Sequence, residues 1–274
     1  MERIPPTHGG RILAIGGHEF TSRDGNGAIC DLIVELADSA HPRICLLPTA
    51  SGDPADQIAG FRRAFGERGC DPSAISLFRL GTESVDVRAH LLAQDAIYVG
   101  GGSMVNLLAI WRAHGLEQVM RECLRAEILV CGQSAGAMCW FEGGITRSTG
   151  RPEPAAGLGL LAGSACVHYD SERDRRERFI DAVREGELPP GLGIEDQTAA
   201  LFEEGSLIET IVARDGAAVR QASPYSETRL RSRAIRAAAP AIDALAPEVL
   251  ELRRTLASRG ARRRSRRSRV GRLD

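Results

Sequence analysis

The sequence contains no lysine, so all 35 of its Lys and Arg positions are arginines. A Gly-Lys-Ser/Thr phosphate loop needs a lysine, and the Gly-x-Gly-x-x-Gly spacing of dinucleotide sites is also missing. Neither His-Glu-x-x-His nor Cys-x-x-Cys occurs, which argues against a zinc site. We therefore expect a chemistry that requires no metal and no organic cofactor.

Long apolar runs are absent as well. No segment reaches the ~18–20 apolar residues of a membrane-spanning helix, and residues 1–6 contain no signal-peptide core. The seven cysteines are scattered singly, which is typical of buried thiols in a reducing cytoplasm. A net charge of -1 provides no global field that would attract nucleic acid or a membrane. These features predict a cytoplasmic protein that binds no membrane, and they argue against binding to nucleic acid. We expect a monomer or a homodimer.

One motif stands out among the residues that are present. Residues 132–136, Gly-Gln-Ser-Ala-Gly, directly follow the apolar run 128–131. A strand that leads through Gly-x-Ser-x-Gly into a helix forms a nucleophile elbow, in which a tight turn lifts the serine hydroxyl above the sheet. The helix N-terminus beside it favours a developing oxyanion. A tight turn with a helix-capping serine is the alternative explanation of the same pattern.

A serine hydroxyl is a weak nucleophile and needs a base, usually a histidine that is oriented by a carboxylate. Among the six histidines only His168 lies downstream of Ser134, and it follows a short apolar run. Glu195 and Asp196 follow another short apolar stretch. The resulting order of serine, histidine and acid differs from the order in α/β-hydrolases.

Four segments together carry a resemblance. They are residues 98–103 (Tyr-Val-Gly-Gly-Gly-Ser), 132–137 (Gly-Gln-Ser-Ala-Gly-Ala), 167–170 (Val-His-Tyr-Asp) and 193–199 (Gly-Ile-Glu-Asp-Gln-Thr-Ala). Over roughly residues 10–215 the chain resembles the peptidase E (aspartyl dipeptidase) and cyanophycinase family of serine peptidases, in the class I glutamine-amidotransferase-like superfamily. The glycine loop followed by the serine elbow is the most specific part of this resemblance.

The resemblance implies a catalytic triad. Ser134 corresponds to the nucleophile and His168 to the general base, whereas Asp196 falls where the family usually has a Glu. Glu195 remains an alternative third member because it is one residue away. Asp170 is another, since it lies two residues after His168 and would point to the same side of a strand.

The surrounding loops suggest further site residues. The N–H group of Ala135 and one from Gly101 or Gly102 should form the oxyanion hole, because glycine lets the backbone approach the reacting carbonyl. After the elbow, Arg147 and Arg151 offer guanidinium groups that suit a substrate carboxylate. A solvated loop explains each of these arginines equally well.

Short apolar runs alternate with helical patterns along the first half of the chain. The runs are 12–15, 44–47, 75–78, 97–99 and 128–130. This alternation predicts an α/β fold with a mainly parallel sheet and helices on both faces, and the resemblance implies a flavodoxin-like, three-layer sandwich. We expect a catalytic domain over residues 1–222. Residues 223–274 should be a C-terminal extension, partly helical, with a disordered arginine-rich tail.

Taken together, these features favour a serine-dependent peptidase that acts through an acyl-enzyme on short peptides. A dipeptidase-like preference for N-terminal Asp is a finer expectation from the resemblance. Two alternatives remain open. One is a non-catalytic amidotransferase-like binding domain, and the other is an esterase or acyl transferase that uses the same serine elbow.

Overall fold

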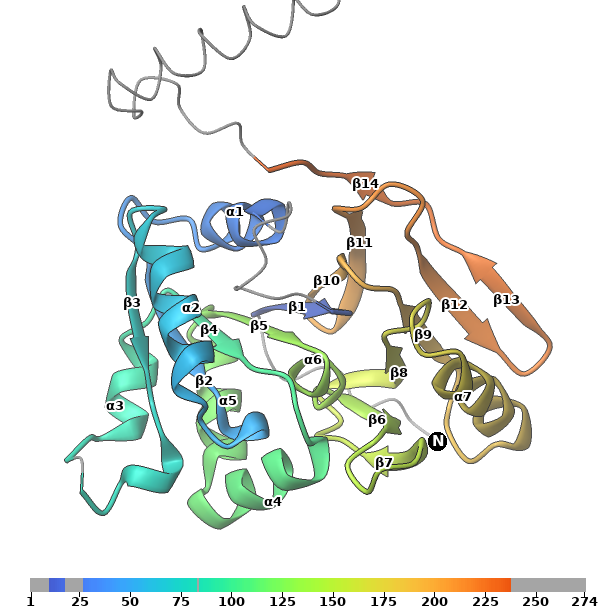
Figure 1. Ribbon diagram of the computed structural model, residues 1–274, viewed down its shortest axis with the longest axis horizontal. Helices are drawn as coiled ribbons and strands as arrows, with labels where there is room; N and C mark the ends of the chain where they lie inside the picture. Colours follow the sequence, from blue (N-terminus) through green and yellow to red (C-terminus); the bar gives the residue numbers. More distant parts are fainter. Residues whose placement is uncertain (1–9, 18–26, 83, 238–274) are drawn as a thin grey trace, which may run out of the picture. The chain divides into compact units, whose positions relative to one another are not determined.

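The computed structural model describes residues 10–17, 27–82 and 84–237, and this part of the chain forms two β-sheets and seven α-helices (Figure 1). In spatial order, the first sheet contains β14 (Arg233–Ala234), β11 (Ser206–Val212), β10 (Thr198–Glu203), β1 (Arg11–Ile15), β5 (Leu129–Gln133), β4 (Ala96–Val99), β2 (Arg43–Leu47) and β3 (Asp71–Ala74). Strands β1 to β5 are mutually parallel, and β10 adds antiparallel to β1.

The second sheet is mixed and follows later in the chain. In spatial order it contains β13 (Ser226–Arg229), β12 (Val219–Ser223), β9 (Gly191–Ile194), β8 (Leu161–Val167), β6 (Phe141–Thr146) and β7 (Glu153–Ala156). Its central strands β6, β8 and β9 are parallel, whereas β7, β12 and β13 are antiparallel to their neighbours. The sequence pattern predicts one mainly parallel sheet, so this second sheet is a feature that the pattern does not reveal.

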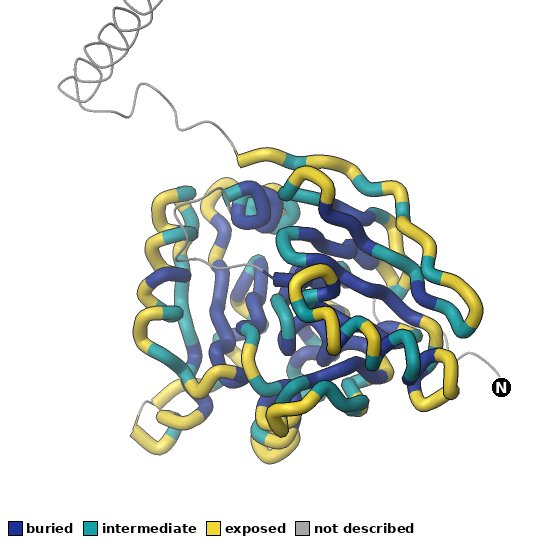
Figure 2. Tube along the Cα trace, turned by 45° about the vertical axis from the view of Figure 1, so that its right-hand side comes forward, coloured by how far each residue is buried: buried dark blue, intermediate teal, exposed yellow. Residues whose placement is uncertain are grey.

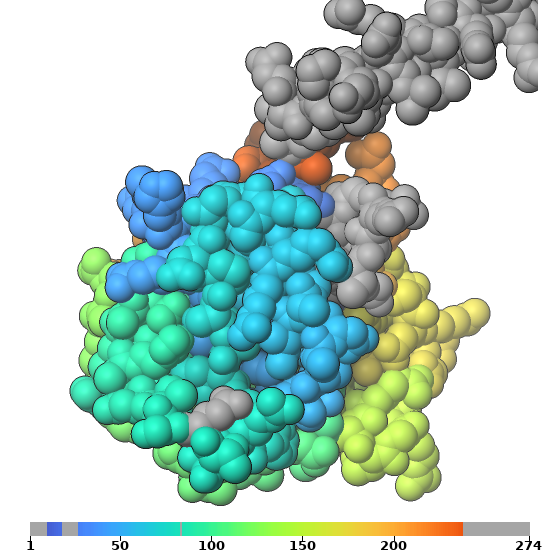
Figure 3. All heavy atoms as spheres, turned by 60° about the vertical axis from the view of Figure 1, so that its left-hand side comes forward, coloured from blue at the N-terminus to red at the C-terminus, as the bar shows by residue number. Residues whose placement is uncertain are grey.

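Seven helices in the described part of the chain pack on the sheets. Their bounds are α1 Gly27–Leu36, α2 Ala55–Gly66, α3 Val87–Leu92, α4 Met104–His114, α5 Leu116–Arg125, α6 Ala135–Met138 and α7 Arg173–Glu185, with 3-10 turns η1 at Thr49–Ser51 and η2 at Leu77–Arg79. None of these helices is long and apolar enough to cross a membrane. Figure 3 shows the cyan and teal segments, which include α2 and α3, forming the surface on this side of the molecule.

Alternating side chains of the parallel strands enter two separate cores, which is why these strands appear as continuous apolar runs. In β1, Leu13 and Ile15 pack with residues of α1 and α2, whereas Ile12 and Ala14 pack with residues of α4, α5 and the second sheet. A third cluster lies between the second sheet and α7. Figure 2 accordingly shows the central strands buried, whereas the edge strands β13 and β14 and many connecting loops are exposed. This layering confirms the predicted α/β class.

Two predicted boundaries need correction. The run 75–78 is not a strand, because β3 is Asp71–Ala74 and Leu77 belongs to η2, where it and Ile75 still enter the core. The expected domain boundary at residue 222 falls inside β12, and the compact unit continues to Ala237 because β13 and β14 pair with the two sheets. The extension predicted beyond that point, including the basic tail, lies outside the described residues.

Candidate active site

Ser134 occupies the turn between β5 and α6, and its backbone has φ 52° and ψ −115°. This region is strained for a residue with a side chain, as a nucleophile elbow requires. The flanking glycines are sterically necessary: a Cβ on Gly132 would lie 2.2 Å from the carbonyl oxygen of Gly136, and one on Gly136 would lie 2.3 Å from that of Val99. The tight turn predicted from the motif is therefore confirmed.

The four chain segments of the site all follow the C-terminal ends of strands. The glycine loop and Ser134 follow β4 and β5, which are neighbours in the first sheet. His168 and Asp196 follow β8 and β9, which are neighbours in the second. The end of β1 joins the two pairs, because the N–H of Ser134 donates to the carbonyl of Ile15 and Gly17 forms a bridge with Asp196. The site therefore lies where the two sheets meet.

A continuous chain of hydrogen bonds links three of the predicted residues. His168 Nε2 lies 2.9 Å from Ser134 Oγ, and His168 Nδ1 lies 2.7 Å from Asp196 Oδ1. An ionised carboxylate can only accept, so Nδ1 donates to Asp196 and Nε2 is left to accept the serine proton. Both side chains are partly exposed, at 26% for His168 and 31% for Asp196, so the site is open to a substrate.

The three candidate acids have different surroundings. Asp196 is the one that reaches the imidazole. Asp170 Oδ1 instead accepts from the N–H of Asp196, at 2.9 Å. Glu195 points away from the histidine and accepts from the N–H of Ala218, at 2.8 Å, and from Arg220, at 3.0 Å. Glu195 and Asp196 differ in this way because neighbouring residues on a chain face opposite ways.

Several groups stabilise the charged form of Asp196. Burial by itself raises the pKa of this carboxyl. Hydrogen bonds from His168 and Ser171 and the charges of His168 and Arg214 together lower the pKa by more than burial raises it, so the pKa lies below its ordinary value. Ser171 Oγ donates to Asp196 Oδ2 at 2.7 Å. Asp196 is therefore ionised at neutral pH and available to orient His168. Ser171 directly follows the 167–170 segment, and only this proximity to the motif could have singled it out.

The glycine loop lies against the serine. A Cβ on Gly101 would lie 3.1 Å from Ser134 Cβ, and one on Gly102, where φ is +140°, would lie 2.2 Å from the carbonyl oxygen of Ala50. Only glycine fits so close to neighbouring backbone in this conformation. Ala135 is the first residue of α6, so its N–H has no acceptor within the helix. The predicted oxyanion groups thus lie beside Ser134.

The two arginines after the elbow differ. Arg147 forms ion pairs with Glu172, at 2.6 Å, and with Asp174, both at the start of α7. Arg151 is exposed and forms no ion pair with any residue in the described ranges. Along the sequence the first acid after Arg147 is Glu153, whereas the acids that neutralise Arg147 come from a distant helix.

Cysteine and metal chemistry find no support in the described part of the chain. Burial raises the pKa of the Cys131 and Cys139 thiols, which flank the elbow, well above the ordinary value, so neither is a thiolate at neutral pH. No group of three or more His, Cys, Asp or Glu side chains among the described residues is arranged to hold a metal ion. The expectation that catalysis needs no metal or cofactor stays a prediction.

A serine elbow with an adjacent imidazole on an α/β framework is the arrangement of a serine hydrolase. The family model "Peptidase family S51" matches residues 12–210, and the chain belongs to this family and is a serine peptidase. It is 40% identical over 207 residues to "Uncharacterized peptidase YgaJ" of Bacillus subtilis (strain 168), covering 76% of this chain and 89% of that protein. It is 26% identical over 219 residues to a cyanophycinase of Trichormus variabilis, covering 76% and 73%.

Solved structures show the same fold. A crystal structure of a peptidase from an acI-B1 Actinobacterium matches with a TM-score of 0.64 and 17% identity, covering 83% of this chain and 96% of that one. A putative peptidase E protein from Listeria monocytogenes EGD-e matches with a TM-score of 0.54 and 18% identity, covering 73% and 97%. At these identities the likeness concerns the fold alone.

Proposed function

We propose that this peptidase cleaves short peptides through a covalent acyl-enzyme on Ser134, with His168 as general base and Asp196 as the group that orients it. The observation that carries the proposal is the unbroken hydrogen-bond chain from Ser134 Oγ through the imidazole to the carboxylate. His168 Nε2 lies within the reach of Ser134 Oγ that proton transfer requires, and Asp196 is held in its charged form.

The first half of the proposed reaction forms the acyl-enzyme. His168 Nε2 takes the proton of Ser134 as Oγ attacks the carbonyl carbon of the scissile bond. The carbonyl oxygen becomes an oxyanion, which accepts hydrogen bonds from the N–H of Ala135 and from an N–H of Gly101 or Gly102. When this intermediate collapses, the C–N bond breaks and the leaving amine takes the proton from His168.

The second half reverses these roles. A water molecule attacks the ester carbonyl while His168 takes one of its protons, and the same N–H groups hold the second oxyanion. Collapse then returns the proton to Ser134 Oγ and releases the carboxylic acid product. Asp196 remains ionised throughout and stabilises the imidazolium that forms in each half.

The Ser134→Ala variant tests this proposal. We expect hydrolysis to fall by at least about 10⁴-fold, because the nucleophile is lost while oxyanion binding remains. The thermal midpoint should change little, since one partly exposed hydroxyl contributes under about 0.5 kcal/mol. A fluorophosphonate should label the unmodified chain at Ser134 and leave the variant unlabelled. Hydrolysis retained at near the original rate would remove Ser134 from the mechanism.

At a finer level we propose a dipeptidase-like enzyme of the cytoplasm that prefers an N-terminal Asp. This proposal is supported by the resemblance to peptidase E and by Arg151, which is exposed and forms no ion pair with any described residue. A panel of Asp-X, Ala-X and Arg-X dipeptides, together with simple esters, tests it. A preference for neutral or basic N-terminal residues would reject the acidic substrate, and faster cleavage of esters alone would favour an esterase.

A further inference from the structure

Asp196 is held at three points. Its Oδ1 accepts from His168 and its Oδ2 from Ser171, so both carboxylate oxygens are occupied. Its backbone N–H, in turn, donates to Asp170 Oδ1 at 2.9 Å. This third contact sets the direction in which the Asp196 side chain leaves the loop, because it fixes the backbone from which that side chain starts.

The contact brings a second carboxylate close to the catalytic one. Asp170 is bound in turn by Arg214, which lies just after β11 and forms an ion pair with Asp170 Oδ2. The neighbouring backbone is tied to the same loop, since the N–H of Ala213 donates to the carbonyl of Gln197 at 2.9 Å. The pair therefore joins three segments, which follow β8, β9 and β11.

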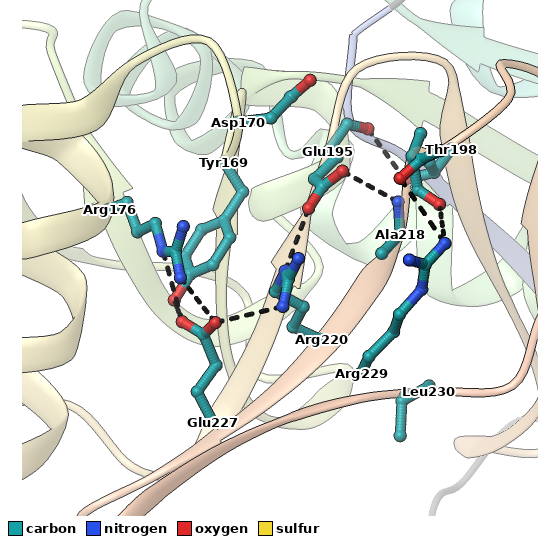
Figure 4. A network of polar contacts seen from close by, with 12 residues as sticks. Tyr169, Asp170, Arg176, Glu195, Thr198, Ala218, Arg220, Glu227, Arg229 and Leu230 are labelled. Carbon is teal, nitrogen blue, oxygen red and sulfur yellow. Dashed lines mark hydrogen bonds and ion pairs between the residues drawn. The ribbon is translucent and has the colours of Figure 1, made fainter.

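The remaining charges of this loop are directed elsewhere. Glu195 binds Arg220 and the N–H of Ala218, and Arg220 continues to Glu227 on β13, as Figure 4 shows. Arg176 completes this second network, since it binds Glu227 and lies over the ring of Tyr169. Among the charged groups described, His168 and Arg214 act on the carboxylate of Asp196, whereas Asp170 contacts its backbone N–H.

We propose that Asp170 and Arg214 form a neutral positioning pair for the catalytic acid. Asp170 fixes the backbone of Asp196, and Arg214 cancels the negative charge that Asp170 would otherwise add beside the triad. The inference rests on the proposed triad and deepens it. Neither residue needs to touch the substrate, because each acts through Asp196.

If the two charges cancel, removing either one should move the titration midpoint of His168, and the two substitutions should move it in opposite directions. With Arg214→Gln, the uncompensated Asp170 favours the imidazolium form of His168, and the titration midpoint of its ring protons should rise by about 0.5–1 pH unit. With Asp170→Asn, the uncompensated Arg214 should lower the midpoint by a similar amount. The double variant should return to within about 0.2 pH unit of the original chain, because both charges are gone.

Nuclear magnetic resonance of the full chain measures this midpoint directly, with His168→Gln to identify the signal. Arg214→Lys keeps the charge and should change little. Arg184→Gln is the matched control, since Arg184 forms an exposed ion pair with Asp181 on α7 and should leave the midpoint unchanged.

The rate of fluorophosphonate labelling at Ser134 separates charge from backbone support. Asp170→Asn keeps an oxygen that can accept from the Asp196 N–H, whereas Asp170→Ala does not. At a pH above the midpoint we expect Asp170→Ala to slow labelling by about tenfold or more and the Asp170→Asn, Arg214→Gln double variant by less than about threefold.

The proposal is overturned if neither single substitution moves the midpoint by more than about 0.2 pH unit. It is also overturned if the two substitutions slow fluorophosphonate labelling additively, so that the double variant is labelled more slowly than either single variant. If the unmodified chain is not labelled at all, the proposed nucleophile fails, and the His168 midpoints still decide whether the pair acts on the histidine.

Discussion

Ser134 and the glycine loop lie among closely packed backbone, whereas His168 and Asp196 lie among hydrogen-bonded and charged side chains. On the serine side, the spaces beside Gly132, Gly136 and Gly102 are closed by carbonyl oxygens at 2.2–2.3 Å from where a Cβ would be. On the acid side, Asp196 is surrounded by a histidine, a serine, an aspartate and an arginine.

The difference follows from the two sheets. The serine elbow follows β5, one of the parallel strands that are buried on both faces. The two cores around these strands are apolar and closely packed. The acid loop lies at the end of the mixed sheet, next to loops that reach the solvent. The serine side should therefore respond to added volume, and the acid side to lost charge.

Asp196→Asn should produce the largest effect on the acid side. An amide leaves His168 unanchored or in the wrong tautomer, and we expect kcat to fall by about 10³–10⁴-fold. Steady-state hydrolysis of a peptide or ester that the unmodified enzyme cleaves provides the measurement. Asp170→Asn is the control and should cost less than about tenfold, since the amide oxygen can still accept from the Asp196 backbone. The reverse order of the two effects would make Asp170 the third triad member.

Glycine-to-alanine substitutions test whether added volume is tolerated near Ser134 and near the acid. A Cβ on Gly132 would meet the backbone of Gly136, so Gly132→Ala should lower the free energy of unfolding by about 1–3 kcal/mol. A Cβ on Gly17 would instead lie 2.2 Å from Asp196 Oδ1 and 2.9 Å from His168 Cε1. Because side chains yield more easily than backbone, Gly17→Ala should reduce kcat by about 100-fold and barely change stability.

Thermal unfolding measured together with kcat separates these two outcomes. Gly66→Ala is the control, because a Cβ added there would have nothing within 4 Å and the residue ends helix α2. It should leave activity unchanged. If Gly17→Ala loses stability and keeps its activity, the contact between this glycine and the triad is not catalytic.

Much of the serine side could be predicted from the sequence, because its structure depends on residues that are close together in the chain. Gly-x-Ser-x-Gly after an apolar run specifies a tight turn, and the alternation of apolar runs with helical patterns specifies the parallel strands. The run at 75–78 misled because Ile75 and Leu77 are buried in a turn rather than in a strand. Burial alone does not distinguish the two.

The acid side was less accessible to prediction because its contacts join distant segments. Glu195 and Asp196 are chemically equivalent in the sequence, and only the end of β9 decides which of them faces His168. Arg214 lies 44 residues after Asp170, with nothing in the motif to link them. The second sheet was missed for the same reason, since its order depends on pairings between strands that are far apart in the chain.

Glu195→Gln should have an intermediate effect, and on stability instead of activity. Glu195 is buried and bound to Arg220 and to the N–H of Ala218, so loss of its charge should cost about 1.5–3 kcal/mol of unfolding free energy. We expect kcat to change by less than about threefold, because this carboxylate points away from His168. Urea unfolding provides the measurement, with Glu209→Gln as a control at a more exposed ion pair. A loss of activity without a loss of stability would instead place Glu195 in the catalytic machinery.

The smallest effect should come from the two arginines beyond the elbow. Arg147 is already neutralised by Glu172 and Asp174, so Arg147→Ala should leave the preference for Asp-X over Ala-X dipeptides within about twofold and should lower the thermal midpoint instead. Arg151 is exposed and forms no ion pair within the described part of the chain, and its contact with a substrate carboxylate would contribute up to about 1 kcal/mol. Arg151→Ala should therefore reduce the preference by about threefold to fivefold, as measured by kcat/KM on matched dipeptides. Loss of the preference in Arg147→Ala alone would mean that the acids of α7 release this arginine to the substrate.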